Sequence, residues 1–334
     1  MTSESNATVI SLQHYPLRNA VHRHSPQRVE DTRRPRPTPL RQEGGAATQV
    51  RAEPNGLAQR VVAAAAFLRR RMTGDYATDE FGFDPEFNDA IVMPLLRALF
   101  NKWFRVEVNG IENLPATGAA LVVANHAGVL PLDGLMVSVA AHDKHPARRP
   151  LRLLAADMVF AGPLLGPTAR KAGHTMACQA DAYRLLSKGE LTAVFPEGYK
   201  GLGKCFRDRY KLQRFGRGGF VSAALRTKAP IIPCSIVGSE EIYPMIGDLR
   251  PLARMLCLPY FPITPLFPLA GSAGLVPLPS KWYIEFGTPI RTADFDDSAL
   301  EDPMVTFELT DQVREIIQRT LYRGLGSRRN IFLG

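Results

Sequence analysis

A histidine and an aspartate stand close together in the stretch LVVANHAGVLPLDGL, residues 121–135. An apolar run stops at Asn125 and His126, and Asp133 opens the next one. An imidazole titrates near physiological pH, so His126 is suited to take a proton from a hydroxyl and return it to a leaving group. A neighbouring carboxylate fixes the imidazole tautomer and stabilises the cation that forms. The pair therefore predicts general-base chemistry.

The spacing of this pair requires a bent chain. On one uninterrupted helix the two residues would lie about 10 Å apart along the axis, too far for a hydrogen bond. Gly128 permits a tight turn, and Pro131 suits the first turn of a following helix. We therefore expect the loop to fold back so that Asp133 faces His126. Taken alone, the pair has a second interpretation, in which Asp133 caps the helix and His126 is a hydrogen-bonded structural residue.

A second constellation follows the apolar run that ends in Phe195-Pro196-Glu197-Gly198. Ligands of a parallel sheet bind beyond the carboxyl ends of its strands, so these residues and His126 are expected on one rim. A basic, glycine-containing segment comes next, with Asp208 as its only acid. Such a segment is typical of a phosphate or pyrophosphate site, or else of a solvated basic face. Its cations are Lys200, Lys204, Arg207, Arg209, Lys211, Arg214 and Arg217.

The elements that must position these residues alternate along the chain from residue 105 onward. This alternation predicts an α/β domain with a mostly parallel central sheet flanked by helices. Strands are expected at 105–110, 119–125, 151–157, 191–198, 230–238 and 281–290, and helices at 134–142, 179–188, 219–227 and 304–324.

Three regions are expected. Residues 1–56 lack an apolar secretory core and are rich in Arg, Pro and Ser, which predicts a disordered basic tail. Residues 57–104 hold two amphipathic helices, 57–72 and 90–104, around an acidic linker, and the helices face either a core or a membrane. Residues 105–325 are expected to form the α/β domain that carries His126 and Asp133.

The totals limit the partners. Among 334 residues, 41 Lys and Arg outnumber 32 Asp and Glu, which favours phosphate-bearing substrates, acidic lipids or nucleic acid. Nucleic acid is disfavoured because the basic segment has few aromatics and no known nucleic-acid motif. The sequence also has no P-loop and no GxGxxG after a strand. The four cysteines form no CxxC, so neither a zinc site nor a disulfide framework is expected and a reducing cytosol fits.

Residues 255–280 form a long stretch without charge. The stretch is long enough to span a bilayer, but it contains six prolines, which break helices and leave backbone groups unsatisfied in lipid. It is therefore not a transmembrane span. Two interpretations stay open, a buried irregular loop and an apolar surface that enters a membrane interface.

Together these blocks resemble a known family. NHAGVLPLD, FPEG and APIIPCSIVG follow the block order of the glycerolipid and lysophospholipid acyltransferases. RVEVNGIENLP, FRDRYKLQRFGRGGF, EEIYP and PLPSKWYIEFG look like the branch that resembles monoacylglycerol and diacylglycerol acyltransferases. The resemblance covers roughly residues 80 to 320 and implies a glycerol-phosphate acyltransferase-like fold.

The resemblance also implies roles for individual residues. His126 matches the family's catalytic base and Asp133 its orienting carboxylate. Glu197 and Gly198 match the block that positions the acyl acceptor, and residues 230–233 match the block that helps line the pocket.

The sequence departs from the family pattern at three places. Six residues separate the histidine from the aspartate where four are commonest. Tyr199-Lys200 stand where many members have Thr-Arg, and residues 173–181 lack the arginine of the acceptor-phosphate block. The spacing fits the monoacylglycerol and diacylglycerol acyltransferase-like branch. The other two departures favour a neutral acceptor, such as a monoacylglycerol, over glycerol 3-phosphate or lysophosphatidate.

The expected function is acyl transfer from a thioester, acyl-coenzyme A or acyl carrier protein, to a hydroxyl of a monoacylglycerol, lysophospholipid or glycerol phosphate. Backbone amides of the 127–130 turn are candidate oxyanion donors. The thioester is a co-substrate, and neither a cofactor nor a metal is expected. Glycerolipid or phospholipid synthesis by a cytoplasmic, peripheral membrane protein is implied, with no expectation of oligomeric state. The alternative is an inactive, lipid-binding protein of the same fold. The expected substrate-binding residues are Asn125, Phe195, Pro196, Glu197, Gly198, Lys200, Arg207, Arg209, Arg214 and Arg217.

Overall fold

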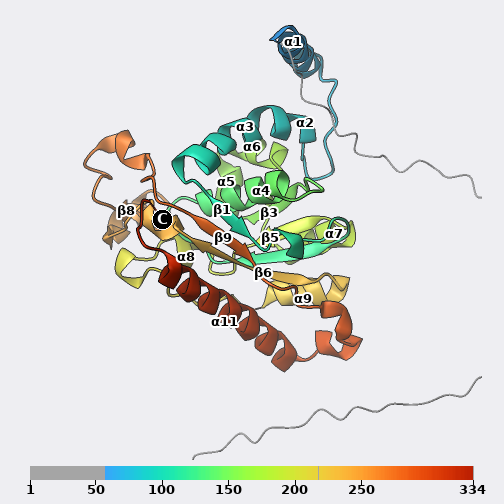
Figure 1. Ribbon diagram of the computed structural model, residues 1–334, viewed down its shortest axis with the longest axis vertical. Helices are drawn as coiled ribbons and strands as arrows, with labels where there is room; N and C mark the ends of the chain where they lie inside the picture. Colours follow the sequence, from blue (N-terminus) through green and yellow to red (C-terminus); the bar gives the residue numbers. More distant parts are fainter. Residues whose placement is uncertain (1–56, 217, 334) are drawn as a thin grey trace, which may run out of the picture. The chain divides into compact units, whose positions relative to one another are not determined.

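The computed structural model describes residues 57–216 and 218–333. The chain divides into two compact units, residues 1–63 and residues 64–334. The first unit contributes only the start of helix α1 (Leu57–Thr73) to the described residues, and the predicted basic tail lies outside them. The second unit carries the sheet and the candidate site (Figure 1). Arg217 also lies outside the described residues.

The sheet of the second unit has seven strands in the order β1-β9-β6-β2-β5-β3-β4. Every neighbouring pair is parallel except β6 and β9, which confirms the predicted mostly parallel α/β fold. The strands are β1 (Glu107–Asn109), β2 (Ala120–Ala124), β3 (Leu151–Ala155), β4 (Thr175–Met176), β5 (Leu191–Val194), β6 (Ile231–Val237) and β9 (Tyr283–Phe286). A separate two-stranded sheet pairs β7 (Gly247–Asp248) with β8 (Pro262–Ile263).

Strand β2 lies at the centre of the sheet, between β5 and β6. All residues of β2 and β6 are buried, which explains their continuous apolar sequences, because helices cover both faces of a parallel sheet. Val123 of β2 is opposite Val194 of β5 and Pro233 of β6. The chain therefore leaves β2 and β5 at one end of the strands, as predicted, and it leaves β6 at the same end.

Two apolar clusters fill the faces of the sheet. Val122 packs in one cluster with α4 and the helical stretch 88–103, and Val123 packs in the other with α7, α9 and α11, because successive strand side chains point to opposite faces. The helices are α2 (Pro85–Phe87), α3 (Met93–Ala98), α4 (Leu132–Lys144), α5 (Asp157–Ala161), α6 (Leu165–Lys171), α7 (Gln179–Ser187), α8 (Tyr199–Leu202), α9 (Gly219–Thr227), α10 (Arg250–Met255) and α11 (Pro303–Ser327).

Most predicted elements are present with shifted ends. The predicted strand 191–198 stops at Val194, because the next residues turn and the Gly198 N–H donates to the Phe195 carbonyl. The predicted helix 90–104 faces the core, where Met93 and Phe100 are buried. The acidic segment 74–90 also contributes buried side chains, since Phe81, Phe83 and Asp84 are buried.

The uncharged stretch 255–280 folds irregularly around β8 and a 3-10 turn (Gly271–Leu275). Most of its large apolar side chains are exposed, so its interpretation as a buried loop is wrong. Among the described residues, no helix combines the length and hydropathy that a bilayer crossing requires.

Candidate active site

The predicted histidine and aspartate meet across the bent loop. His126 Nδ1 lies 2.7 Å from Asp133 Oδ2. The same carboxylate accepts hydrogen bonds from the Ala127 N–H (2.9 Å) and the Gly134 N–H (2.8 Å). Asp133 is fully buried. Three donors therefore fix one carboxylate, which holds both the imidazole ring and the backbone on either side of the loop.

The loop between the two residues needs an unusual backbone. Gly128 has a φ of +97°, and a Cβ there would stand 2.7 Å from the Ser239 carbonyl oxygen, so only glycine fits. Val129 also has a positive φ, +61°, which is rare for a β-branched residue. Its N–H donates to the Leu202 carbonyl, and its carbonyl accepts from the Tyr260 hydroxyl. Contacts from two other segments thus hold the loop in place.

The second ring nitrogen of His126, Nε2, is available to contact a substrate. Nε2 has no hydrogen-bond partner in the part of the chain that the structure describes, and the side chain is 11% exposed. The Phe195 ring lies against the imidazole, with ring centroids 4.6 Å apart. The ring is therefore oriented from Nδ1 and from one face, and Nε2 can accept a proton from a substrate.

Glu197 joins the two strand ends, as the predicted common rim requires. Its Oε1 accepts from the His126 N–H (2.9 Å), and its Oε2 accepts from the Gln213 N–H (2.6 Å). Burial raises the pKa of this carboxyl. Close backbone approach completes the junction, because a Cβ on Gly201 would stand 2.5 Å from the His126 carbonyl oxygen. Glu197 therefore positions the backbone of His126.

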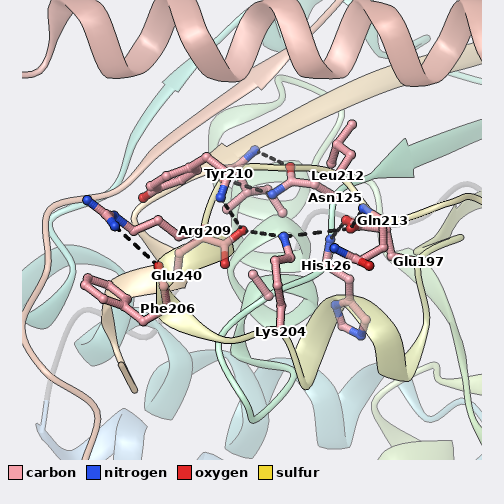
Figure 2. A network of polar contacts seen from close by, with 12 residues as sticks. Asn125, His126, Glu197, Lys204, Phe206, Arg209, Tyr210, Leu212, Gln213 and Glu240 are labelled. Carbon is pink, nitrogen blue, oxygen red and sulfur yellow. Dashed lines mark hydrogen bonds and ion pairs between the residues drawn. The ribbon is translucent and has the colours of Figure 1, made fainter. Parts of the chain in front are cut away.

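Lys204 lies inside the protein, between two glutamates (Figure 2). Its Nζ is 2.8 Å from Glu240 Oε1 and 3.8 Å from Glu197 Oε2. Burial and the neighbouring Glu197 carboxylate raise the pKa of Glu240 to about 7, although the ammonium opposes the shift. The prediction that Lys204 belongs to a phosphate-binding segment is wrong, because its ammonium faces the carboxyls of Glu240 and Glu197 inside the protein.

The residues that follow Lys204 are hydrogen-bonded to other parts of the second unit. The Tyr210 N–H donates to Glu240 Oε1, and its hydroxyl donates to Glu241 Oε1 at 2.6 Å. Arg328 also donates to Glu241, and Gln318 of α11 bonds the backbone on both sides of Lys211. Much of the predicted phosphate-binding segment is therefore a structural connection.

Four of the other predicted cations have different surroundings in the part of the chain that the structure describes. Arg207 is exposed beside Asp208, and Arg209 stacks on Phe206 and shares a hollow of about 410 Å³ with the C-terminal end of the chain. Arg214 lines a different hollow, of about 630 Å³, with Arg314 of α11. Lys200 is exposed on α8. Arg209 and Arg214 therefore line different hollows, and phosphate binding by these cations stays a prediction.

Three further predicted residues have structural partners. The Asn125 side-chain amide bonds both the N–H and the carbonyl of Ile236, which fastens the end of β2 to β6. The Pro196 carbonyl accepts from the Gly216 N–H, and Gly198 has a φ of +53° at the start of α8. Their contact with substrate stays a prediction.

Sequence reasoning missed Gln213, Glu240 and Tyr260. Tyr260 comes from the uncharged stretch, and nothing local indicates its contact with Val129. The sequence does contain an indication of Glu240. The acidic pair Glu240-Glu241 comes shortly after β6, at the same end of the strands as His126.

Comparison with known proteins gives a consistent result. A family model described as Acyltransferase matches residues 105–237. The chain is 73% identical over 291 residues to an uncharacterised protein of Mycobacterium tuberculosis, a match that covers 87% of this chain and 81% of the relative. An uncharacterised protein of Mycobacterium leprae is 72% identical over 278 residues, covering 83% and 76%.

More distant matches have descriptive names. The DGAT1/2-independent enzyme synthesizing storage lipids of Bos taurus is 27% identical over 224 residues, covering 65% of this chain and 59% of that protein. Among solved structures, the 1-acyl-sn-glycerophosphate (LPA) acyltransferase PlsC of Thermotoga maritima matches with a TM-score of 0.46 and 20% identity, covering 74% of this chain and 85% of that one.

Proposed function

The chain belongs to the glycerolipid acyltransferase family, and on this premise we propose that it moves a fatty acyl group from a thioester to a hydroxyl of a glycerolipid. His126 is the proposed general base and Asp133 its positioning partner. The observation that carries the proposal is the 2.7 Å contact between His126 Nδ1 and Asp133 Oδ2, which leaves Nε2 for the substrate.

The proposed reaction uses one proton transfer in each direction. His126 Nε2 takes the proton of the acceptor hydroxyl as its oxygen attacks the thioester carbonyl. Asp133 stabilises the imidazolium that forms. When the tetrahedral intermediate collapses, the carbon–sulfur bond breaks and the imidazolium returns the proton to the departing sulfur. The products are an ester and a free thiol.

The developing oxyanion needs a hydrogen-bond donor. Of the four amides in the 127–130 turn, Ala127 donates to Asp133, Val129 to the Leu202 carbonyl and Leu130 to the Gly128 carbonyl. The Gly128 N–H has no acceptor in the described ranges, so it is the proposed donor to the oxyanion.

We propose a neutral acceptor, such as a monoacylglycerol, and a location at a membrane surface where such lipids reside. The absence of arginine from residues 173–181 and the dispersal of the cations after β5 support a neutral acceptor. The name of the bovine relative refers to storage lipids, which agrees with this choice. Acyl-coenzyme A and acyl carrier protein both remain proposed donors.

The test is thiol release from acyl-coenzyme A or acyl carrier protein by the purified full chain, with monoacylglycerols, diacylglycerols, lysophospholipids and glycerol 3-phosphate as acceptors. We expect thiol release that depends on a monoacylglycerol and an equal amount of new ester identified by mass. Dependence on glycerol 3-phosphate alone would contradict the neutral acceptor. Vesicle binding without thiol release from either donor would favour the inactive, lipid-binding alternative.

A further inference from the structure

We propose that a set of exposed apolar side chains between β6 and β9 docks the protein onto an anionic lipid bilayer. These side chains are 39% to 90% exposed, whereas single-chain proteins rarely expose so many large apolar groups on one stretch. We call them the docking surface. They are Ile246, Leu249, Met255, Leu256, Leu258, Leu266, Leu269, Leu275 and Val276.

The docking surface has the charge pattern of a bilayer contact. No charged residue occurs from 255 to 280, and Arg250 and Arg254 are exposed just before this stretch, where Asp248 lies 3.7 Å from Arg250 and offsets one of the two cations. Apolar side chains that enter the boundary between headgroups and acyl chains gain from burial, and adjacent guanidinium groups gain from anionic headgroups. The stretch is irregular and broken by prolines, so it can lie in the interface but not cross the bilayer.

The docking surface is built onto the active-site loop. Tyr260, in the middle of this stretch, donates its hydroxyl to the Val129 carbonyl and closely approaches Gly203. Its phenol pKa is raised by burial and by the nearby Asp133 and Tyr199. In Figure 1 the stretch is the orange segment around β8 that extends away from the sheet. A bilayer at this surface would therefore lie beside the loop that carries His126.

Other exposed apolar groups leave the sheet at the same edge. Leu130 follows β2, Met158 and Leu164 follow β3, and Tyr199 follows β5, and all four are exposed. These strands and β6 are mutually parallel, so their carboxyl ends share one rim. The apolar exposure is thus concentrated on the rim where a lipid acceptor would have to arrive.

A bilayer fits this surface better than a second copy of the chain. Self-association through it would bring Arg250 and Arg254 toward the same cations of the other copy, in a protein with a formal net charge of +9. Like charges at an interface oppose association. Anionic lipid headgroups instead attract these cations, so binding to a bilayer is not opposed by this repulsion. The inference agrees with the proposed function but does not require that the enzyme be active.

The test is flotation of the full chain with vesicles of phosphatidylcholine containing phosphatidylglycerol. The variant Met255→Ser/Leu269→Ser changes two strongly exposed side chains, so its fold and thermal unfolding should match the parent protein. We expect vesicle affinity to fall about tenfold or more, because two large apolar side chains no longer enter the lipid. Arg250→Gln/Arg254→Gln should weaken binding to anionic vesicles and leave binding to neutral vesicles nearly unchanged.

The matched control is Met304→Ser/Phe307→Ser, since both side chains are exposed on α11, on a different element. This control should bind vesicles as the parent protein does. Equal binding by the Met255/Leu269 variant, or no binding by the parent protein, would overturn the proposal. If the Met255→Ser/Leu269→Ser variant has a lower oligomer mass by light scattering but binds vesicles as the parent does, the surface serves self-association. That result would also overturn the proposal. Thiol release with a dispersed acceptor is read separately, so an inactive protein that still docks would contradict only the proposed function.

Discussion

At the scale of residues, the site depends on how buried polar groups share partners. Asp133 uses one carboxylate to hold a ring and two backbone amides, so the position of His126 and the shape of its loop are coupled. Glu197 does the same from the next strand by accepting from the His126 N–H and the Gln213 N–H. One ammonium, Lys204, then faces Glu197 and Glu240 together. One ammonium cannot neutralise two buried carboxylates, so the charge of this network is expected to change with pH.

This imbalance predicts how stability changes with pH. The pKa of Glu240 rises from 4.5 to about 7 on folding. Between these values the unfolded chain is ionised while the folded protein holds a proton, so the Glu240 contribution is present below about pH 4.5 and is lost as pH rises to about 7. Glu197 is shifted in the same direction. In Glu240→Gln, the free energy of unfolding from urea titrations should fall less over this interval.

The control for this prediction is Glu112→Gln, because Glu112 is exposed. It should keep the slope of the parent protein. Asp143, whose pKa is lowered to about 2 by Arg97 and His142 against the effect of burial, loses its contribution only in more acidic solution. An unchanged slope in Glu240→Gln would mean that Glu240 is ionised throughout the interval and fully paired with Lys204.

At the scale of elements, the sequence predicted the features that follow from apolar patterns and from parallel strand pairing. Continuous apolar runs predicted β2, β5 and β6, and parallel pairing predicted that His126 and Glu197 share a rim. The basic segment was misjudged because Lys204 and Tyr210 find their partners, Glu240 and Glu241, about thirty residues later. Pairing across such a separation depends on the fold and leaves no local pattern. The exposure of the uncharged stretch was open for the same reason.

The junction of the two strand ends makes a prediction about backbone contact. In Gly201→Ala the new Cβ would stand 2.5 Å from the His126 carbonyl oxygen and 2.8 Å from the Glu197 Cβ, so the backbone of one segment must shift. A shift of about 1 Å at the catalytic ring lowers turnover by roughly 10²-fold. We therefore expect a large loss in kcat, measured as thiol release at saturating substrate.

Gly216→Ala is the matched control, since its Cβ would meet only the Pro196 carbonyl oxygen, at 3.9 Å, and its φ is not in the left-handed region. It should leave kcat within about twofold of the parent, as expected for a surface change. Equal activity of Gly201→Ala and Gly216→Ala would show that the close contact with His126 does not position the base.

At the scale of the whole molecule, one edge of the sheet carries both chemistry and exposed apolar groups. The proposed catalytic pair, Glu197 and the start of the proposed docking surface all follow strands at their carboxyl ends. The other end of each strand carries none of the proposed machinery. If the proposed docking is correct, a single face meets the membrane, while two apolar clusters pack on the opposite faces of the sheet. Composition favoured anionic partners in general, and the fold is needed to propose a surface for them.

We propose that the Nε2 atom of His126 removes the proton of the acceptor hydroxyl. The most direct measurement compares thiol release by the parent protein and by His126→Ala, both with the acceptor that the panel identifies and with thermal unfolding recorded for each. We expect the variant to unfold at a lower temperature, because buried Asp133 loses one partner, but to stay folded at the assay temperature, and kcat to fall by about 10²- to 10⁴-fold, the usual contribution of a general base. Undiminished thiol release and ester formation by a folded His126→Ala protein would contradict the proposal.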